Sequence, residues 1–259
     1  VALGSGFALG KLCQPDAMPR AGQAGIRDWL VVMKRFPADA LYDRIAVRRG
    51  LRAEEAEAIA EAIVRFHGTA PKATRPSQGR SLDWVVAGNL AEIRRRTPGL
   101  FARQDVDRLS RRSIAAAARL HGLLAERRRA GFVRHVHGDL HLRNICEIGG
   151  KPVLFDALEF DPKLATIDVL YDLAFLLMDL EHRGLHTASN RLFNHYLALS
   201  VDLNDGALAL KGLAALPLFL ASRAAIRAHT EAAAAAAQTS RSKAVDLRRE
   251  AKRYLNLAN

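Results

Sequence analysis

The chain of 259 residues carries 39 lysines and arginines against 27 acidic residues, a net charge of +12, and 49% of its residues are hydrophobic. This composition excludes a disordered tail and a fibrous protein, and the chain is long enough for one large domain or two small ones. Two cysteines, Cys13 and Cys146, are too few for a disulfide framework or a thiolate zinc site, so we expect a reducing, cytoplasmic setting. Pro217 and Arg223 interrupt the most apolar stretch, 213–226, and we therefore predict no membrane span.

The amino-terminal part of the chain is predicted to hold one strand followed by helices. Residues 29–36 are a short β-branched and aromatic run that ends at Pro37, which is typical of a buried strand that enters a turn. Apolar periodicity and glycine stops predict helices after it, at 38–49, 53–67, 81–96 and 101–130.

The middle of the chain changes to short strands. Residues 133–137 alternate like a strand and lead into a polar loop at 138–144. Two apolar runs follow, 145–148 and 152–155, and the glycine pair between them predicts a β-hairpin. From residue 167 to the end, alanine- and leucine-rich periodicity predicts helices.

The distribution of charge points to chemistry on a phosphate. Residues 91–143 hold thirteen arginines against five acids, whereas residues 144–206 hold ten acids against four basic residues. Carboxylates can hold a divalent cation, and arginines attract phosphate, so this arrangement favours a site that handles a polyanion through a metal ion.

Nucleic acid is the alternative partner for the arginine runs 94–96 and 127–129. Aromatic residues make up only 6% of the chain, and none lies among these runs as a stacking platform for bases would. We therefore interpret the runs as solvated helix faces or helix ends and do not expect nucleic acid to bind.

The residues with the clearest chemical meaning lie at 137–144, in the sequence His-Gly-Asp-Leu-His-Leu-Arg-Asn, and at Asp156. Asp139, on a loop after a strand, can accept a proton from a hydroxyl group. Asn144 and Asp156 offer oxygen ligands, and the predicted hairpin between them would bring them to neighbouring strand ends. Magnesium, which accepts few protein ligands, suits such a pair better than calcium does.

This motif resembles the catalytic core of the aminoglycoside phosphotransferase and choline kinase family, which is related to the protein kinases. The resemblance implies an α/β (α+β) protein-kinase-like fold with a mostly helical carboxy-terminal lobe and a small β-hairpin. It also implies transfer of a phosphoryl group from ATP to a hydroxyl of a small molecule. By position, Asp139 resembles the catalytic base, Asn144 and Asp156 resemble the magnesium ligands, and His137 resembles a support for the loop.

Two further segments resemble the same family. Residues 30–37 are similar to the strand and hinge that hold adenine, which implies Met33 as gatekeeper and the backbones of Lys34 and Phe36 as contacts to the base. Residues 168–174 are similar to the helix start whose aspartate, here Asp172, braces the catalytic loop. Within the family, the chain looks most like bacterial members that are often fused to a P-loop kinase domain, which implies such a domain as a fusion or partner.

The amino-terminal end departs from the family pattern. A kinase amino-terminal lobe supplies a glycine-rich loop and a strand lysine paired to a glutamate, and only 28 residues precede Trp29. We therefore expect residues 1–36 to be the remnant of a truncated amino-terminal lobe with its hinge strand, and residues 37–259 to be the helical lobe with the catalytic loop and metal site. A catalytically silent kinase-like binding or regulatory module is the alternative function.

Other interpretations of the site residues are weaker. His137, Asp139 and His141 alternate as the ligands of a metallohydrolase would, but the sequence holds no convincing second histidine cluster to complete such a site. Asp179 and Glu181 are expected on a solvated helix face, and Glu159 is expected to be a loop carboxylate. His67 is expected to be an ordinary packing or surface residue, and Cys146 a core residue.

Overall fold

The computed structural model describes residues 2–4, 26–29, 37–201 and 205–259, and the chain divides into two compact units, Val1–Pro37 and Ala38–Asn259. In the first unit, strands β1 (Ala2–Gly4) and β2 (Ile26–Trp29) pair in antiparallel fashion. Of the strand predicted at 29–36, only Trp29 lies within the described residues, at the end of β2.

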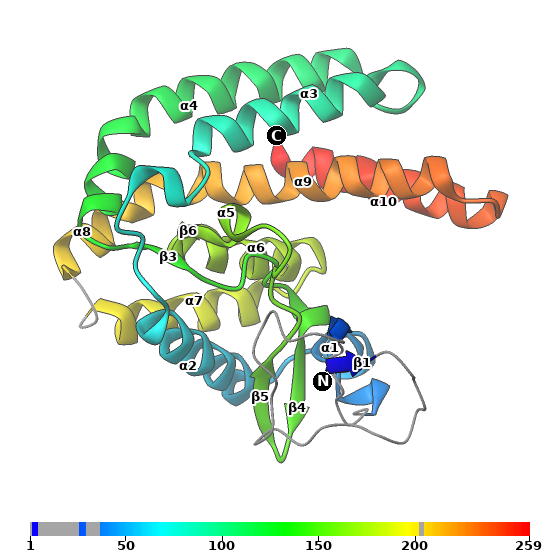
Figure 1. Ribbon diagram of the computed structural model, residues 1–259. Coiled ribbons are helices and arrows are strands. Elements are labelled where there is room, and N and C mark those ends of the chain that lie inside the picture. Colours follow the sequence, from blue (N-terminus) through cyan, green and yellow to red (C-terminus); the bar gives the residue numbers. More distant parts are fainter. Residues whose placement is uncertain (1, 5–25, 30–36, 202–204) are drawn as a thin grey trace. The chain divides into compact units, whose positions relative to one another are not determined.

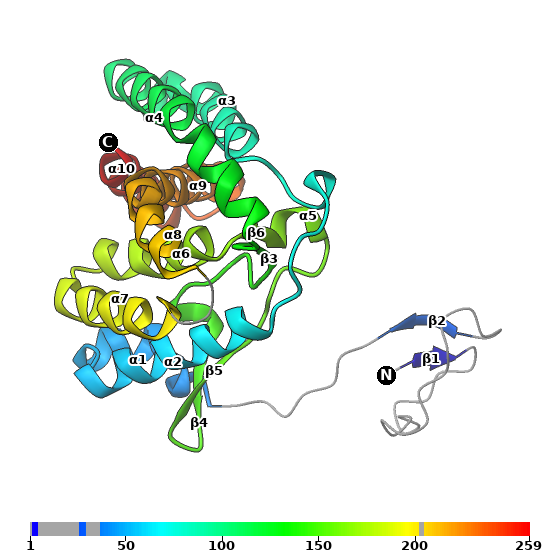
Figure 2. The same cartoon turned by 90° about the vertical axis from the view of Figure 1, so that its left-hand side faces the viewer.

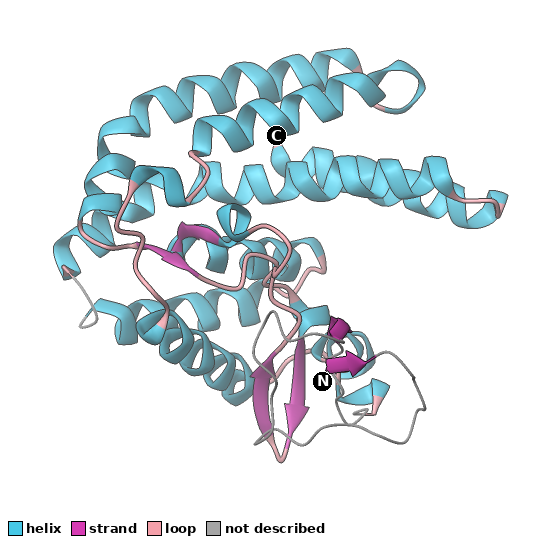
Figure 3. Cartoon of the chain, viewed as in Figure 1, coloured by secondary structure: helices cyan, strands magenta, loops and turns pink. Residues whose placement is uncertain are grey.

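The second unit is mostly helical (Figures 1 and 3). Its helices are α1 (Tyr42–Arg49), α2 (Ala53–Thr69), α3 (Leu82–Leu100), α4 (Arg103–Arg129), α5 (Pro162–Ala165), α6 (Val169–His182), α7 (His186–Ser200), α8 (Gly206–Lys211), α9 (Leu216–Ala237) and α10 (Arg241–Ala258). The first four confirm the predicted helices, with small shifts at their ends. Non-helical backbone at Pro98 and Gly99 interrupts α3 close to the predicted end at residue 96, because proline cannot continue the helical hydrogen bonds.

Among the described residues of this unit, two pairs of strands are antiparallel. Strands β4 (Ile145–Ile148) and β5 (Lys151–Leu154) form the predicted hairpin around Gly149 and Gly150, both of which have positive φ. Strand β3 (Val133–His135) pairs with β6 (Thr166–Asp168). The prediction of a helix from residue 167 is wrong at its start, because the backbone there pairs with β3 and the helix begins only at Val169, where Asp168 caps it.

Helix α6 lies at the centre of the helical unit. Every residue from Val169 to Leu180 is buried, because α6 packs between α7 and α9 and also touches the 3₁₀-helix Leu142–Asn144. Leu140 and Leu142 are fully buried in the same core. These two leucines thereby anchor the polar loop 138–144 in the hydrophobic core.

Four of the longer helices lie as two neighbouring pairs. Helix α3 runs beside α4, and α9 runs beside α10, in both views of the molecule (Figures 1 and 2). Among the described residues, the helical stretch Gly206–Ala237 is long and apolar enough to cross a membrane by length and composition, and half of its most apolar window is buried in the protein. Within that stretch, α9 packs on α3, α6 and α10, which are the surroundings of a core helix.

Candidate active site

The polar loop 138–144 begins at Gly138, shortly after β3 ends at His135. Gly138 has a φ of +78°, and a Cβ atom there would lie 2.7 Å from Leu158 Cδ1. A residue other than glycine would therefore be strained in its backbone and would also displace Leu158. This glycine allows the turn that presents Asp139.

Asp139 is held by two neighbours from its own loop. The Asn144 side-chain amide donates to the Asp139 backbone oxygen at 2.9 Å and to its carboxylate Oδ2 at 3.1 Å, and His141 Nε2 lies 3.4 Å from the same Oδ2. Burial alone would raise the pKa of Asp139, but His141, Arg223 and Asn144 together hold it below its ordinary value. The side chain is about one-third exposed at 37%, so an ionised carboxylate can meet a substrate.

His137 fixes the backbone of the loop in two directions. Its Nε2 donates to the Phe155 carbonyl at 2.8 Å, which leaves Nδ1 to accept the backbone N–H of Asp139 at 3.3 Å. The bond to Phe155 links the loop to the residue that precedes Asp156. Both ring nitrogens are engaged, so His137 is not free to serve as the ligand that the metallohydrolase interpretation requires.

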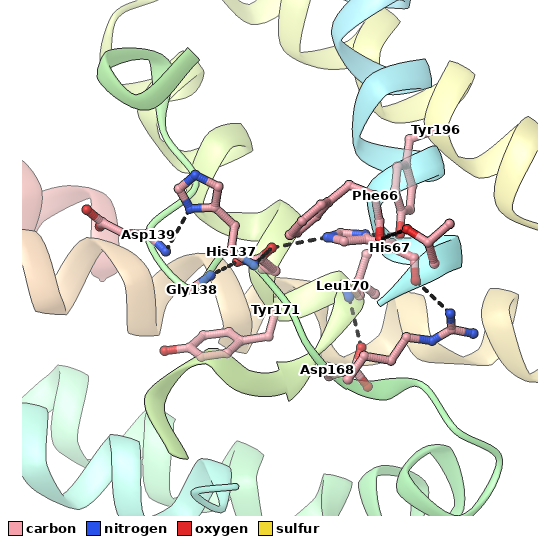
Figure 4. A network of polar contacts seen from close by, with 12 residues as sticks. Phe66, His67, His137, Gly138, Asp139, Asp168, Leu170, Tyr171 and Tyr196 are labelled. Atoms are coloured by element: carbon pink, nitrogen blue, oxygen red, sulfur yellow. Dashed lines mark hydrogen bonds and ion pairs between the residues drawn. The ribbon is translucent and has the colours of Figure 1, made fainter. Parts of the chain in front are cut away.

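The carboxylate of Asp172 supports the loop at His137 and Gly138, which are labelled in Figure 4. This fully buried carboxylate accepts hydrogen bonds from the backbone N–H of Gly138 at 2.8 Å and of His137 at 3.3 Å, and from His67 Nε2 at 3.1 Å. Burial would raise the pKa of Asp172, but the hydrogen bond and charge of His67, with Arg223, hold it below its ordinary value. Asp172 thus holds the backbone at the start of the loop, and its role as the brace of a catalytic loop stays a prediction.

His67 and Asp179 are supporting residues that the sequence did not reveal. His67 is buried, and its other ring nitrogen, Nδ1, lies 2.9 Å from the Tyr196 hydroxyl. Asp179, expected on a solvated face, is buried and accepts the backbone N–H of Leu142 at 3.1 Å. That expectation is wrong because Asp179 lies on the side of α6 that faces the loop, whereas Glu181 is only partly buried.

A third aspartate connects this helix to α4. Asp168, which caps α6, accepts two hydrogen bonds from Arg127, at 2.8 and 2.7 Å. Arg127 is almost fully buried, so the interpretation of the run 127–129 as a solvated helix end is wrong for this arginine. Buried ion pairs of this two-pronged form place elements accurately relative to one another.

Asn144 and Asp156 lie at neighbouring strand ends, as the hairpin predicted. The backbone N–H of Phe155 donates to the Asn144 carbonyl at 3.1 Å, and Ile145 is paired with Leu154. Asp156 follows with a φ of +60°, and no other residue in the described ranges, glycines apart, has positive φ. An exposed carboxylate in this rarely adopted conformation is typical of functional positions.

The oxygen atoms of this pair fit a magnesium ion. The Asn144 amide nitrogen is committed to Asp139, so its Oδ1 remains free to bind a cation, and Asp156 makes no ion pair or side-chain hydrogen bond to any described residue. Within the described ranges, no group of three or more His, Cys, Asp or Glu side chains could hold a metal. Magnesium tolerates such a sparse protein set, because phosphate oxygens and water complete its shell.

Three of the predicted site residues belong to the hinge. Met33, Lys34 and Phe36 lie outside the described residues, and their contact with adenine stays a prediction.

Arg223 of α9 is buried, although the sequence showed it only as a break in an apolar stretch. It donates a hydrogen bond to the Tyr171 carbonyl and lies 4.0 Å from Asp172. Its charge also helps to lower the pKa of Asp139.

The sequence comparisons match most of this chain. The model of a family described as "Phosphotransferase enzyme family" matches residues 19–209. Proteins described as uncharacterized from Mycobacterium tuberculosis (strain ATCC 25618 / H37Rv) and Mycobacterium bovis (strain ATCC BAA-935 / AF2122/97) are each 30% identical over 212 residues. These matches cover 78% of this chain and 40% of each relative, so the chain spans about two fifths of the length of the curated relatives it matches.

Solved structures of a glucosamine kinase are similar in fold. Crystal forms B and A both give a TM-score of 0.50 at 16% sequence identity. Each match covers 85% of this chain, together with 56% of the form B chain and 53% of the form A chain. With the family match, this similarity confirms the protein-kinase-like fold that the motif implied.

Proposed function

The chain belongs to the phosphotransferase enzyme family, and from that premise we propose that it transfers the γ-phosphoryl group of ATP to a hydroxyl group of a small molecule, with Mg²⁺ as cofactor. The observation that carries the proposal is the double hydrogen bond from Asn144 to Asp139. It fixes a carboxylate beside an amide oxygen that can bind a metal. The same amide thus links the acceptor side of the site to the nucleotide side.

Asp139 positions the acceptor hydroxyl and takes its proton. The acceptor oxygen forms a bond to the γ-phosphorus as the bond from that phosphorus to the leaving oxygen of ADP breaks, and the hydroxyl proton passes to Asp139. Because its pKa is below the ordinary value, Asp139 is a weak base toward a neutral alcohol. Proton transfer is therefore late, when the acceptor oxygen has become acidic through its bond to phosphorus.

Asn144 and Asp156 would hold the magnesium ion. When bound, the ion supplies positive charge between the β and γ phosphates. Two buried atoms near Asp139, His141 Nδ1 and Arg223 Nη2, have no hydrogen-bond partner among the described residues. We assign adenine to the backbones of Lys34 and Phe36, with Met33 beside them, on the resemblance of their segment to the family's hinge.

Setting and partners follow from the family resemblance. We propose a cytoplasmic site of action, since ATP and a reduced Cys146 suit that compartment. A P-loop kinase domain as fusion or partner is proposed on the same basis, and the greater length of the curated relatives leaves room for one. For the acceptor we propose only its chemical class, a small molecule that carries a hydroxyl group.

Substitution of Asp139 by Asn tests the assignment. Phosphoryl transfer from ATP, measured across a panel of small hydroxyl compounds and to water, should fall by about 10²–10⁴-fold, because the group that orients and deprotonates the acceptor is lost. Binding of ATP should remain. Glu159→Gln is the matched control, since Glu159 is an exposed carboxylate on the loop after β5 with no partner among the described residues, and its rate should be unchanged. An Asp139→Asn rate equal to that of the wild type removes Asp139 from the mechanism.

A further inference from the structure

A small pocket of about 190 Å³ lies where the start of α3, the end of α4 and the start of α6 meet. Leu124 and Phe219 supply part of its apolar lining, and Arg80, Arg128 and Tyr171 supply polar groups. Pockets for drug-sized ligands are typically about 300–1,000 Å³, so this one suits a single small group and not a nucleotide.

Three residues that line this pocket each carry a buried polar atom with no hydrogen-bond partner. The atoms are Arg80 Nε, Arg128 Nη1 and the Tyr171 hydroxyl, three of eight such side-chain atoms in the described part of the chain. A buried polar atom without a partner is costly, and native proteins hold few of them. Their concentration among the residues of one pocket indicates that something from outside the chain completes them.

All three atoms can donate a hydrogen bond. A guanidinium N–H only donates, and burial raises the pKa of Tyr171, which keeps its hydroxyl protonated. The partner must therefore present acceptor oxygens, and two cationic donors favour a negatively charged one.

The acidic residues near the pocket do not satisfy these donors. Asp168 is engaged by Arg127 through two hydrogen bonds. Asp83 is more than half exposed and lies 3.7 Å from His121. Asp161 lies 3.8 Å from Arg80 Nη2, at the outer edge of the guanidinium. The guanidinium carbon of Arg80 lies 4.4 Å from the centre of the Trp84 ring. These two contacts fix the side chain of Arg80 and leave its Nε unpaired.

We propose that this pocket binds a small oxyanion, a carboxylate or phosphate group, through Arg80, Arg128 and Tyr171. The proposal goes beyond phosphoryl transfer and does not depend on it. One lining residue is linked to the proposed catalytic site through Arg223, because the guanidinium of Arg223 lies 3.9 Å from the ring of Tyr171 and its charge lowers the pKa of Asp139. In the view of Figure 4, the Tyr171 phenol and the Asp139 carboxylate point to the same side of the backbone.

Calorimetric titration of the whole chain with inorganic phosphate, and separately with malonate, tests the proposal at constant ionic strength in chloride. We expect saturable binding of at least one probe, and the preferred probe distinguishes a phosphate site from a carboxylate site. Arg128→Gln should weaken binding about tenfold or more, because it removes a charged donor. Arg129→Gln, one residue further and exposed, removes the same charge outside the pocket and should bind like the wild type.

Tyr171→Phe provides a second and independent readout. The variant should bind the anion several-fold more weakly, yet without the anion it should unfold at the same temperature as the wild type or a higher one, since the lost hydroxyl has no partner. The proposal is overturned if neither probe binds saturably to the wild type, or if Arg128→Gln and Arg129→Gln weaken binding alike. A lower unfolding temperature for Tyr171→Phe without the anion would also contradict it, because the hydroxyl would then have a partner within the protein.

Discussion

The loop 138–144 and the arginine-lined pocket both lie among buried polar groups, but these groups differ in whether they have partners within the chain. Beneath the loop, Asp172 accepts three hydrogen bonds and His137 uses both ring nitrogens. Among the residues that line the pocket, donors of Arg80 and Arg128 have no partner. Asp172 and His137, which are satisfied within the chain, shape the loop, whereas the unsatisfied donors of the pocket residues are those for which we propose a ligand. Buried polar groups are costly without partners, so the difference separates scaffold from binding site.

The largest expected effect comes from breaking the scaffold beneath the loop. Asp172→Ala should lower the free energy of unfolding by about 3–5 kcal/mol, because it leaves two backbone N–H groups and His67 without their acceptor in the core. Urea unfolding followed by circular dichroism measures the change. Asp246→Ala, at an exposed position of α10, should stay within about 0.5 kcal/mol. An equally small change in the free energy of unfolding from both substitutions would show that the hydrogen bonds to Asp172 do not stabilise the loop.

A paired carboxylate that belongs to neither proposed site tests the same rule through pH. The hydrogen bond from Arg49, with others from Arg52, lowers the pKa of Glu55 to about 2 from its ordinary 4.5. A carboxylate whose pKa is lower in the folded state adds stability above pH 4.5, and this is lost as the pH falls toward 2. Glu55→Gln should therefore cost on the order of 2 kcal/mol at pH 7 and almost nothing near pH 2.

The control for that pH series is Glu54→Gln, one residue earlier on α2 and exposed. Its unfolding free energy should follow the wild type at every pH. If the cost of Glu55→Gln were the same at pH 7 and pH 2, the ionised carboxylate would not be the source of the stability.

Alanine substitutions at two glycines with different surroundings are expected to change the free energy of unfolding by smaller amounts. A Cβ atom at Gly212 would overlap the buried guanidinium of Arg127, so Gly212→Ala should destabilise the protein by about 1–3 kcal/mol. Gly122, within α4, has open space, and Gly122→Ala should stabilise by about 0.5–1 kcal/mol. Thermal unfolding of the two variants distinguishes these opposite signs, and the same sign for both would contradict the packing of Arg127.

Local patterns predicted the parts of the fold that depend on nearby residues. The hairpin at 145–154 was predicted from its glycine pair, and the early helices from apolar periodicity. The family resemblance of residues 137–144 put Asn144 in the same site as Asp139, and Asn144 donates two hydrogen bonds to Asp139. Turn chemistry and helix stops act over a few residues, so they can be read directly along the chain.

Residues that act across long distances in sequence could not be predicted in this way. His67 meets Asp172 across 105 residues, and Arg127 meets Asp168 across 41. Strand β6 forms only because β3 lies beside it, and an arginine in a basic run gives no sign that it is buried. The roles of Met33, Lys34 and Phe36, and of residues 1–36 as the remnant of an amino-terminal lobe, stay predictions.

The central claim is that Asn144 and Asp156 bind a nucleotide-associated magnesium ion beside Asp139. Calorimetric titration of ATP with and without Mg²⁺ tests it most directly. We expect Mg²⁺ to strengthen ATP binding to the wild type and to Glu159→Gln about equally. Asp156→Asn should lose most of that strengthening, because a neutral amide replaces the charged ligand. An ATP affinity that is undetectable, or that is the same with and without Mg²⁺ in the wild type, would contradict the account.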